Sequence, residues 1–253
     1  MRKVFIALTA IIALSSCEKE DVSIPAAISK TLSKTSYVYN GNTPETEEFT
    51  FDTNGKIVSI KENDRTHTFN FVSASSLEVT ERSNSNSSII NIRHCVLNDK
   101  GFVTQMVVKN ASGTISGTYD YTYNAEGFQT GRQLTYPNGD IYKNEYSYAD
   151  GKLIYSKTYK NNVLESHTNI TYDNTKANKT RLNFWTSYWD VPGLFGKETK
   201  YLLSETKGYN NSNTLISHDQ YTFELDADGY PLKETRNFVL TGKLGVKNYT
   251  FIK

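Results

Sequence analysis

The sequence predicts an all-β protein: an antiparallel hairpin meander that forms a strongly curved or barrel-like sheet, with one short helical or loop plug near residues 180–197. Three observations support this fold class. From residue 35 onward, apolar and polar residues alternate in short runs bounded by Gly, Asn and Asp, as half-buried strands do. A hairpin motif recurs along this region. One stretch, "FWTSYWDVPGLFGK", holds both tryptophans and interrupts the pattern.

The N-terminus, "MRKVFIALTAIIALSSCEKE", has the pattern of an export signal. Arg2 and Lys3 precede an apolar run of 11 residues, Val4 to Leu14. A helix needs roughly 20 residues to cross the bilayer, so this run fits a signal peptide instead. The run ends in Leu14-Ser15-Ser16-Cys17, which resembles the lipobox of bacterial lipoproteins. We therefore expect residues 1–16 to be cleaved and Cys17 to carry the lipid anchor.

Residues 17–34 are expected to form the lipidated cysteine and a flexible tether, because they contain few aromatic residues and no strand pattern. Lys19-Glu20-Asp21 resembles the acidic export signal of surface-exposed lipoproteins in Bacteroidota; a solvated charged tether is the alternative. The expected location is the outer membrane, lipid-anchored, at the cell surface. The sequence leaves open whether the periplasmic or the external leaflet holds the anchor.

Residues 35–253 are expected to form a single domain built from repeats. The turn glycines of the repeat are Gly55, Gly101, Gly127, Gly151 and Gly229, at spacings close to multiples of 23 to 26 residues. Two aromatics at i and i+2 precede each turn and lie on one face of a strand. In the first such hairpin, Phe49, Phe51, Val58 and Ile60 are predicted to share a face. Around nine periods fit, giving 14 to 18 strands, and a sheet of that size must curl, split or close.

The repeats "YNAEGFQ", "YADGKLI", "FDTNGKI" and "LDADGYP" resemble YD repeats, the hairpins of RHS-type shells. The lipobox, the repeats and "FW..YW..PGLFGK.TKYLLSE" together resemble a family of Bacteroidota lipoproteins with a porin-like fold and no assigned activity. This resemblance implies a curved or barrel-like sheet and implies no activity. Strands that carry Lys, Glu, Asn and Thr opposite their aromatics lack the outward apolar band of a membrane barrel.

Composition excludes several functional classes. Without residues 1–16 the formal charge changes from +1 to −1, so nothing favours nucleic acid as a partner. Cys95 stands alone after lipidation of Cys17 and is predicted to be a core residue. No metal site, cofactor or catalytic residue is expected, because the four histidines lack metal-ligand spacing and no nucleophile motif occurs. The acidic loop 224–229 is predicted to be a hairpin turn rather than a calcium loop.

The tryptophan stretch is the one candidate ligand platform. Phe184, Trp185, Tyr188 and Trp189 would lie on one side of a short helix. Because a curved sheet leaves a concave face to fill, a buried plug is the favoured interpretation. The alternative is an exposed platform formed by Trp185, Tyr188 and Trp189.

The leading hypothesis for function is a non-enzymatic binding or accessory module at the cell envelope. The alternative is a carbohydrate-binding lipoprotein of a glycan-uptake system, using Trp185, Trp189 and neighbouring tyrosines. A hydrolase with a site assembled across strands is the third hypothesis. Expected partners are the membrane, through Cys17, and a glycan or an envelope protein; the oligomeric state is left open.

Overall fold

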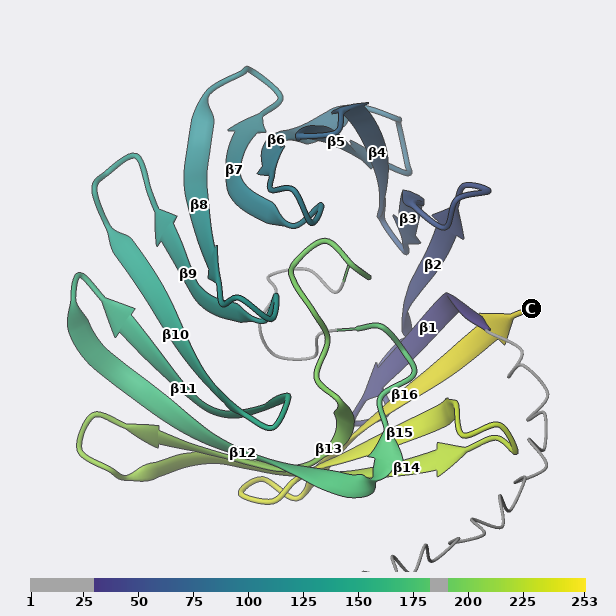
Figure 1. Cartoon of the computed structure of the whole chain (residues 1–253), viewed down its shortest axis with the longest axis vertical. Helices are drawn as coiled ribbons and strands as arrows, with labels where there is room; N and C mark the ends of the chain where they lie inside the picture. The colour runs from purple at the N-terminus through teal and green to yellow at the C-terminus, as the bar shows by residue number, and fades with distance from the viewer. Residues whose placement is uncertain (1–29, 183–190) are drawn as a thin grey trace, which may run out of the picture.

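The chain folds into a closed antiparallel barrel of 16 strands (Figure 1). A computed structural model describes residues 30–182 and 191–253. Each strand pairs with the next along the chain, and β1 pairs with β16 to close the barrel. The described residues contain no helix. The predicted all-β fold is confirmed, and the strand number lies within the predicted range.

The strands are β1 (Thr31–Tyr39), β2 (Glu45–Phe51), β3 (Ile57–Glu62), β4 (Arg65–Ser73), β5 (Ser76–Ser83), β6 (Ile89–Leu97), β7 (Val103–Asn110), β8 (Ile115–Tyr123), β9 (Gln129–Thr135), β10 (Ile141–Ala149), β11 (Lys152–Lys160), β12 (Val163–Ala177), β13 (Tyr201–Asn210), β14 (Leu215–Leu225), β15 (Pro231–Phe238) and β16 (Lys243–Ile252). The first strand therefore begins at Thr31, inside the range 17–34 that the sequence assigns to the tether.

The repeat turns have a common construction. In the β2–β3 turn, the Asp52 carboxylate accepts the backbone N–H groups of Asn54 and Lys56, and the Gly55 N–H donates to the Asp52 carbonyl. Asn98 and Asp226 play the same part in the β6–β7 and β14–β15 turns. All five repeat glycines have positive φ, between 73° and 95°. The sequence motif thus predicts these turns correctly, because glycine adopts this conformation without strain.

A β-bulge follows each of the five repeat glycines. Three residues after the glycine, one residue is skipped in the pairing with the preceding strand; these extra residues are Val58, Thr104, Thr130, Ile154 and Leu232. A bulge turns its extra residue out of the alternation and bends the strand. The predicted face is therefore wrong at one position: Val58 is 38% exposed and points outward, whereas Ile57 is 3% exposed and takes its place inside.

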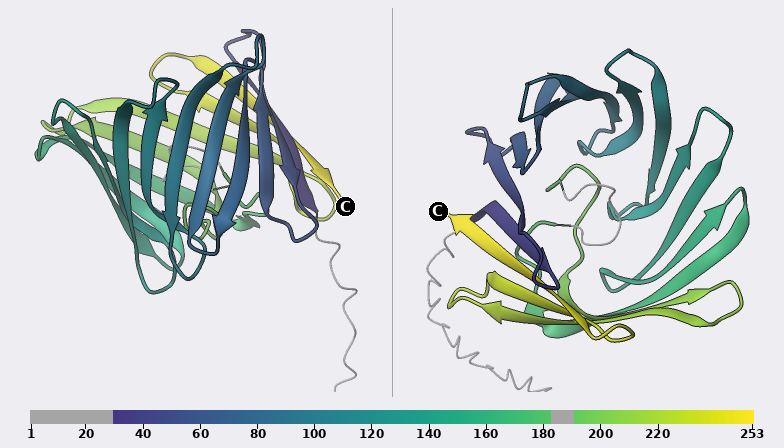
Figure 2. Two further views of the ribbon diagram at one scale, coloured as in Figure 1. Left: turned by 90° about the horizontal axis from the view of Figure 1, so that it is seen from above. Right: turned by 180° about the vertical axis from the view of Figure 1, so that it is seen from behind.

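The start of β1, the end of β16 and the described parts of the long β12–β13 connection lie at one end of the barrel, called here the plugged end (Figure 2). This follows from the up-and-down order, because the β2–β3, β4–β5, β6–β7, β8–β9, β10–β11 and β14–β15 turns fall at that same end. The inward side chains near it are mostly apolar and form the main core cluster, which includes Phe49, Leu77 and Met106. Cys95 belongs to this cluster as predicted, and burial raises the pKa of its thiol to about 12.

Toward the opposite end, the inner wall is polar and contains buried ion pairs. The Glu81 carboxylate is fully buried and receives Arg65 at 2.9 Å and Arg93 at 2.6 Å. Across the barrel, Arg236 pairs with Asp219 at 2.7 Å. Buried charges are tolerated when they are paired and hydrogen-bonded. The barrel interior therefore divides into an apolar half at the plugged end and an ion-paired half beyond it.

Candidate functional site: a pocket beside the plug

The predicted site residues lie outside the part of the chain that the structure describes. Trp185, Tyr188 and Trp189 fall within residues 183–190, and Cys17 precedes residue 30. The helix predicted from the spacing of these aromatics falls in the same undescribed range. Their flanks are described, however, and form turns and loop over residues 180–182 and 191–197. In these flanks the predicted helical or loop plug is a loop.

The flanking residues pack inside the barrel. Residues 178–182 and 191–200, called here the plug, run through the centre of the ring of strands (Figure 1). Leu182, Leu194 and Phe195 are 0%, 6% and 3% exposed and belong to the main core cluster. The Phe195 ring lies 5.1 Å from the ring of Tyr121 on β8. Apolar plug residues therefore fill space that the inward side chains of the wall leave open.

Backbone hydrogen bonds attach the plug to successive turns of the plugged end. The Val103 N–H donates to the Leu194 carbonyl at 2.9 Å, and the Lys197 N–H donates to the Gly127 carbonyl at 2.8 Å. The Lys200 N–H donates to the Gly151 carbonyl at 3.0 Å. The plug is thus held at the β6–β7, β8–β9 and β10–β11 turns, since backbone groups buried away from water need such partners.

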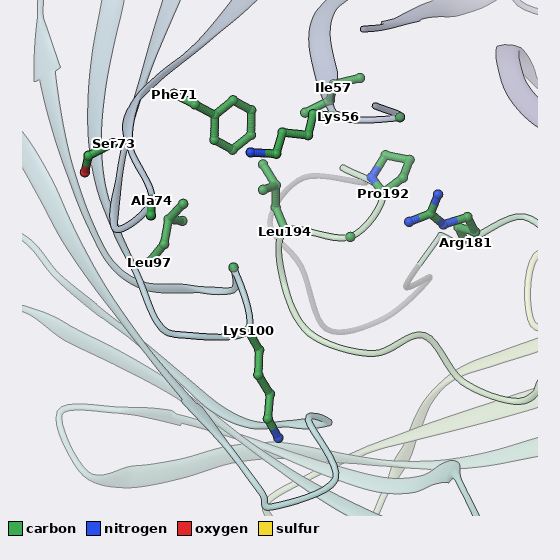
Figure 3. Close-up of a pocket in the computed structure, with 13 residues that line it drawn as sticks. Lys56, Ile57, Phe71, Ser73, Ala74, Leu97, Lys100, Arg181, Pro192 and Leu194 are labelled. Carbon is green, nitrogen blue, oxygen red and sulfur yellow. The ribbon is translucent and has the colours of Figure 1, made fainter. Parts of the chain in front are cut away.

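A pocket opens between the plug and the turns on the β2 to β7 side of the barrel (Figure 3). Its buried lining is apolar and comes from wall and plug alike: Ile57, Leu97 and Leu194 are 3%, 6% and 6% exposed, and the half-buried Phe71 completes it. Its exposed rim is polar and contains glycines of the β2–β3 and β6–β7 turns. An apolar floor below a polar rim is the usual construction of a small-molecule site.

Three cations line the pocket, and its 13 lining residues include no carboxylate. The Lys56 ammonium lies 4.9 Å from the centre of the Phe71 ring, a cation–π contact. The Lys100 ammonium donates to the Ala125 carbonyl at 2.7 Å and extends away from the pocket. Arg181 is exposed and has a left-handed φ of 61°, which is uncommon for a residue with a side chain. The pocket therefore combines apolar surface with positive charge.

The carboxylate of Asp52, in the β2–β3 turn, accepts hydrogen bonds from the backbone of that turn. A backbone hydrogen bond from Lys56, the main cause, holds the pKa of Asp52 below its ordinary value. Asp52 is therefore ionised at neutral pH, but its oxygens are directed to the turn.

The described residues hold no group of three His, Cys, Asp or Glu side chains that could bind a metal ion. In the loop 224–229, Asp226 and Asp228 each lie 2.6 Å from the Lys30 ammonium. The loop forms the predicted hairpin turn, and its acidic side chains clamp the residue that precedes β1.

Sequence reasoning missed this pocket because its residues come from four separate segments. The sequence did contain a signal for the two lysines, because Lys56 and Lys100 each adjoin a repeat glycine. In an up-and-down barrel, every second hairpin turn lies at the same end, so both of these turns share one end. Mapping the charges of those turns onto one end of the barrel would have brought the two lysines together. The sequence could not have placed Arg181 in this pocket, because no motif near it shows where the plug enters the barrel.

No protein-family model matches the chain, and no curated protein sequence is significantly similar to it. Solved structures are similar in fold. A porin-like protein from Bacteroides uniformis has a TM-score of 0.68 at 15% identity, over 87% of this chain and 98% of that one. A porin-like protein from Bacteroides vulgatus has a TM-score of 0.59 at 14% identity, over 88% of this chain and 99% of that one. At these identities the likeness concerns the fold.

Proposed function

We propose that the protein is an outer-membrane lipoprotein, anchored through Cys17 at the cell surface, whose plugged barrel acts as a non-enzymatic binding or accessory module. The observation that carries the proposal is the chemistry of the outer wall. A barrel that crosses a membrane needs an outward apolar band about 25 Å tall. Here the outward residues in the middle of β4 and β5 are polar, as Thr68, Asn70, Glu78 and Thr80 show, and exposed apolar residues such as Val96 and Ile154 occur on other strands.

The topology supports attachment at the plugged end. Lys30 is the last described residue before β1, and its ammonium is clamped by Asp226 and Asp228 of the β14–β15 turn. Twelve residues separate Lys30 from Cys17. As a flexible coil they would span about 20 Å on average. A lipid on Cys17 would hold the plugged end toward the bilayer and turn the opposite end outward. Among the described residues, no helix is suited to crossing a bilayer.

Two experiments on cells test the proposal. Changing Cys17→Ala should move the protein from the membrane fraction to the soluble fraction, and protease added to intact cells should digest the wild-type protein. Continued membrane association of the variant would contradict the anchor, and full protection from protease would contradict surface exposure. Purified protein should leave planar bilayers without steady conductance, since the plug occupies the barrel; open-pore currents would contradict a binding module.

Carbohydrate binding is the second candidate, and one observation on the outer wall favours it. Three partly exposed rings lie in a row across β11, β12 and β13: the His167 ring is 5.6 Å from Tyr155 and 5.2 Å from Tyr209. The Tyr155 and His167 rings are tilted by 42°, and the His167 and Tyr209 rings are stacked. Exposed aromatic rings can stack on sugars, although cross-strand aromatic pairs also stabilise sheets.

The matched test is affinity electrophoresis through gels that contain soluble polysaccharides. If this row binds glycan, the Tyr155→Ala/Tyr209→Ala double variant should lose the retardation that the wild type shows. Tyr136→Ala, which removes an exposed tyrosine of the β9–β10 turn outside this row, should keep it. Equal retardation of all three proteins would exclude the row as the site.

A further inference from the structure

We propose that the pocket beside the plug binds an amphiphile with a single anionic head, a phosphate, sulfonate or carboxylate, whose apolar part lies on the pocket floor. The proposal does not depend on how the protein is anchored. It concerns the described residues Lys56 and Arg181 at the rim and Phe71, Leu97 and Leu194 below them.

The head is assigned from the charge of the rim. Lys56 and Arg181 lie on either side of the plug residue Pro192 (Figure 3). No described carboxylate lines the pocket to neutralise them, in contrast to the paired charges of the barrel interior. Elsewhere in the described chain, the lumen-facing Arg93 and Arg236 are paired with Glu81 and Asp219, and a third, Arg132, donates to the amide oxygen of Asn144. An anion held between a lysine and an arginine would supply the missing counter-charge.

The apolar part is assigned from the floor. Ile57, Leu97 and Leu194 expose little surface, but they form the wall of a space open to solvent together with the face of Phe71. Covering apolar surface is worth roughly 25 cal/mol per Å², so an alkyl chain or a flat ring gains from lying there. A free inorganic anion would leave this surface wet. The combination of floor and rim therefore favours an amphiphile over a simple ion.

The backbone of Arg181 is a further sign of a built site. With φ at 61°, it is a non-glycine residue in the left-handed region, a conformation that costs of order 1 kcal/mol. The residue follows Thr180 and precedes Leu182, which are 1% and 0% exposed. Two buried neighbours thus fix the backbone, and the strained residue between them directs its guanidinium toward the pocket (Figure 3). Strain of this kind concentrates at ligand sites.

The test is a calorimetric titration of residues 18–253, which contain every strand of the closed barrel, with decyl phosphate below its micelle concentration. The Lys56→Gln/Arg181→Gln variant should bind about 5- to 30-fold more weakly, the loss of two partly solvated charge contacts. Lys61→Gln/Lys34→Gln, which removes the exposed Lys61 and the half-buried Lys34 of the outer wall, should bind like the wild type. Equal affinity of both double variants would overturn the proposal.

Two ligand controls separate head from tail. Decyl maltoside, which is neutral, should bind more weakly than decyl phosphate, and equal binding would refute the anionic head. Inorganic phosphate should bind more weakly as well, and equal binding would refute the apolar floor. Both rim substitutions lie at exposed positions, so circular dichroism melting should show an unchanged barrel.

The source of the amphiphile is distinguished with membranes. The same proteins are sedimented with vesicles of phosphatidylcholine, with and without phosphatidylglycerol. If the rim variant loses decyl phosphate binding and also vesicle binding that depends on phosphatidylglycerol, the ligand is a membrane lipid headgroup. If it loses decyl phosphate binding alone, the ligand is a free amphiphile. If neither measurement changes, the pocket is not an anionic amphiphile site.

Discussion

The buried carboxylate of Glu81 offers the sharpest test of the barrel interior. It is fully buried on β5 and receives Arg65 at 2.9 Å, Arg93 at 2.6 Å and the Asn91 amide at 3.0 Å. In Glu81→Gln, the amide keeps one oxygen acceptor, and its NH2 group would face the N–H donors of one of the two guanidinium groups. Arg65 is 39% exposed and keeps its ion pair with Asp64 at 2.9 Å, so losing the Glu81 carboxylate costs little stability at Arg65. Arg93 is buried and loses its carboxylate, which costs about 3 to 5 kcal/mol.

Urea unfolding followed by circular dichroism measures this cost. With a slope of about 3 kcal/mol per molar urea, the midpoint should fall by about 1 to 2 M. Glu78→Gln is the matched control, because Glu78 lies on the same strand, points outward and is 38% exposed. It should change stability by no more than about 0.5 kcal/mol. A loss below about 1 kcal/mol in Glu81→Gln would refute the view that this network holds the polar half of the barrel together.

The stability that Glu81 and Arg93 contribute should change with pH in a definite direction. Burial raises the pKa of Glu81, but the Asn91 hydrogen bond and the Arg93 charge outweigh it and leave the pKa below the ordinary 4.5. A depressed pKa gives stability that is present above about pH 4.5 and is lost as the pH falls through the folded-state value. The difference in unfolding free energy between wild type and Glu81→Gln should therefore be constant near neutrality and shrink in acid. A difference that grows in acid would contradict this assignment.

Three further predictions concern the wall and the plug. Ile57→Lys should lower the unfolding free energy by about 3 kcal/mol or more, and Val58→Lys should change it by less than about 0.5 kcal/mol, because the bulge turns the second residue outward; urea melts of the pair decide this. The Cys95 thiol, buried and with its pKa raised to about 12, should react with Ellman's reagent only when urea unfolds the protein, and rapid reaction of the native protein would show an open wall. Gly196→Ala would place a methyl group 2.8 Å from a backbone oxygen of the facing turn and should lower the unfolding free energy by about 2 kcal/mol or more. Gly113→Ala, where φ is similar but the surrounding space is open, should lower it by about 1 kcal/mol. Equal shifts in melting temperature would mean that the plug does not pack against this turn.

The fold could be predicted because its signal is local and repeated. Two aromatics, an Asx residue and a glycine specify strand, turn and strand within a dozen residues, and the topology follows from joining neighbours. The bulge after each glycine could not be read in the same way. Val58 and Ile57 are both β-branched, so alternation alone allows either to face inward, and the pairing with β2 decides between them.

The candidate site could be predicted only in part: the sequence indicates the plug but not the pocket beside it. The sequence identifies the stretch around Trp185 as unusual, and its described flanks do fill the barrel. The pocket that this filling creates depends on where Leu194 meets Leu97 and Ile57, residues far apart along the chain. Such contacts are fixed by barrel closure, and closure is a property of all 16 strands together rather than of any one segment.

The number of strands explains why the chain needs a plug at all. Eight strands give a barrel that wall side chains can fill, and the interior widens roughly in proportion to the strand number. With 16 strands the lumen is too wide for residues such as Met106 or Tyr121 to meet across it, so another segment or water must occupy the centre. The chain supplies Leu194 and Phe195 at one end and paired charges such as Glu81 and Arg93 beyond them. A plug that meets a curved wall from inside cannot match it everywhere, and the pocket beside Leu194 is such a mismatch. The pocket lies at the same end of the barrel as the start of β1, where the proposed tether would join.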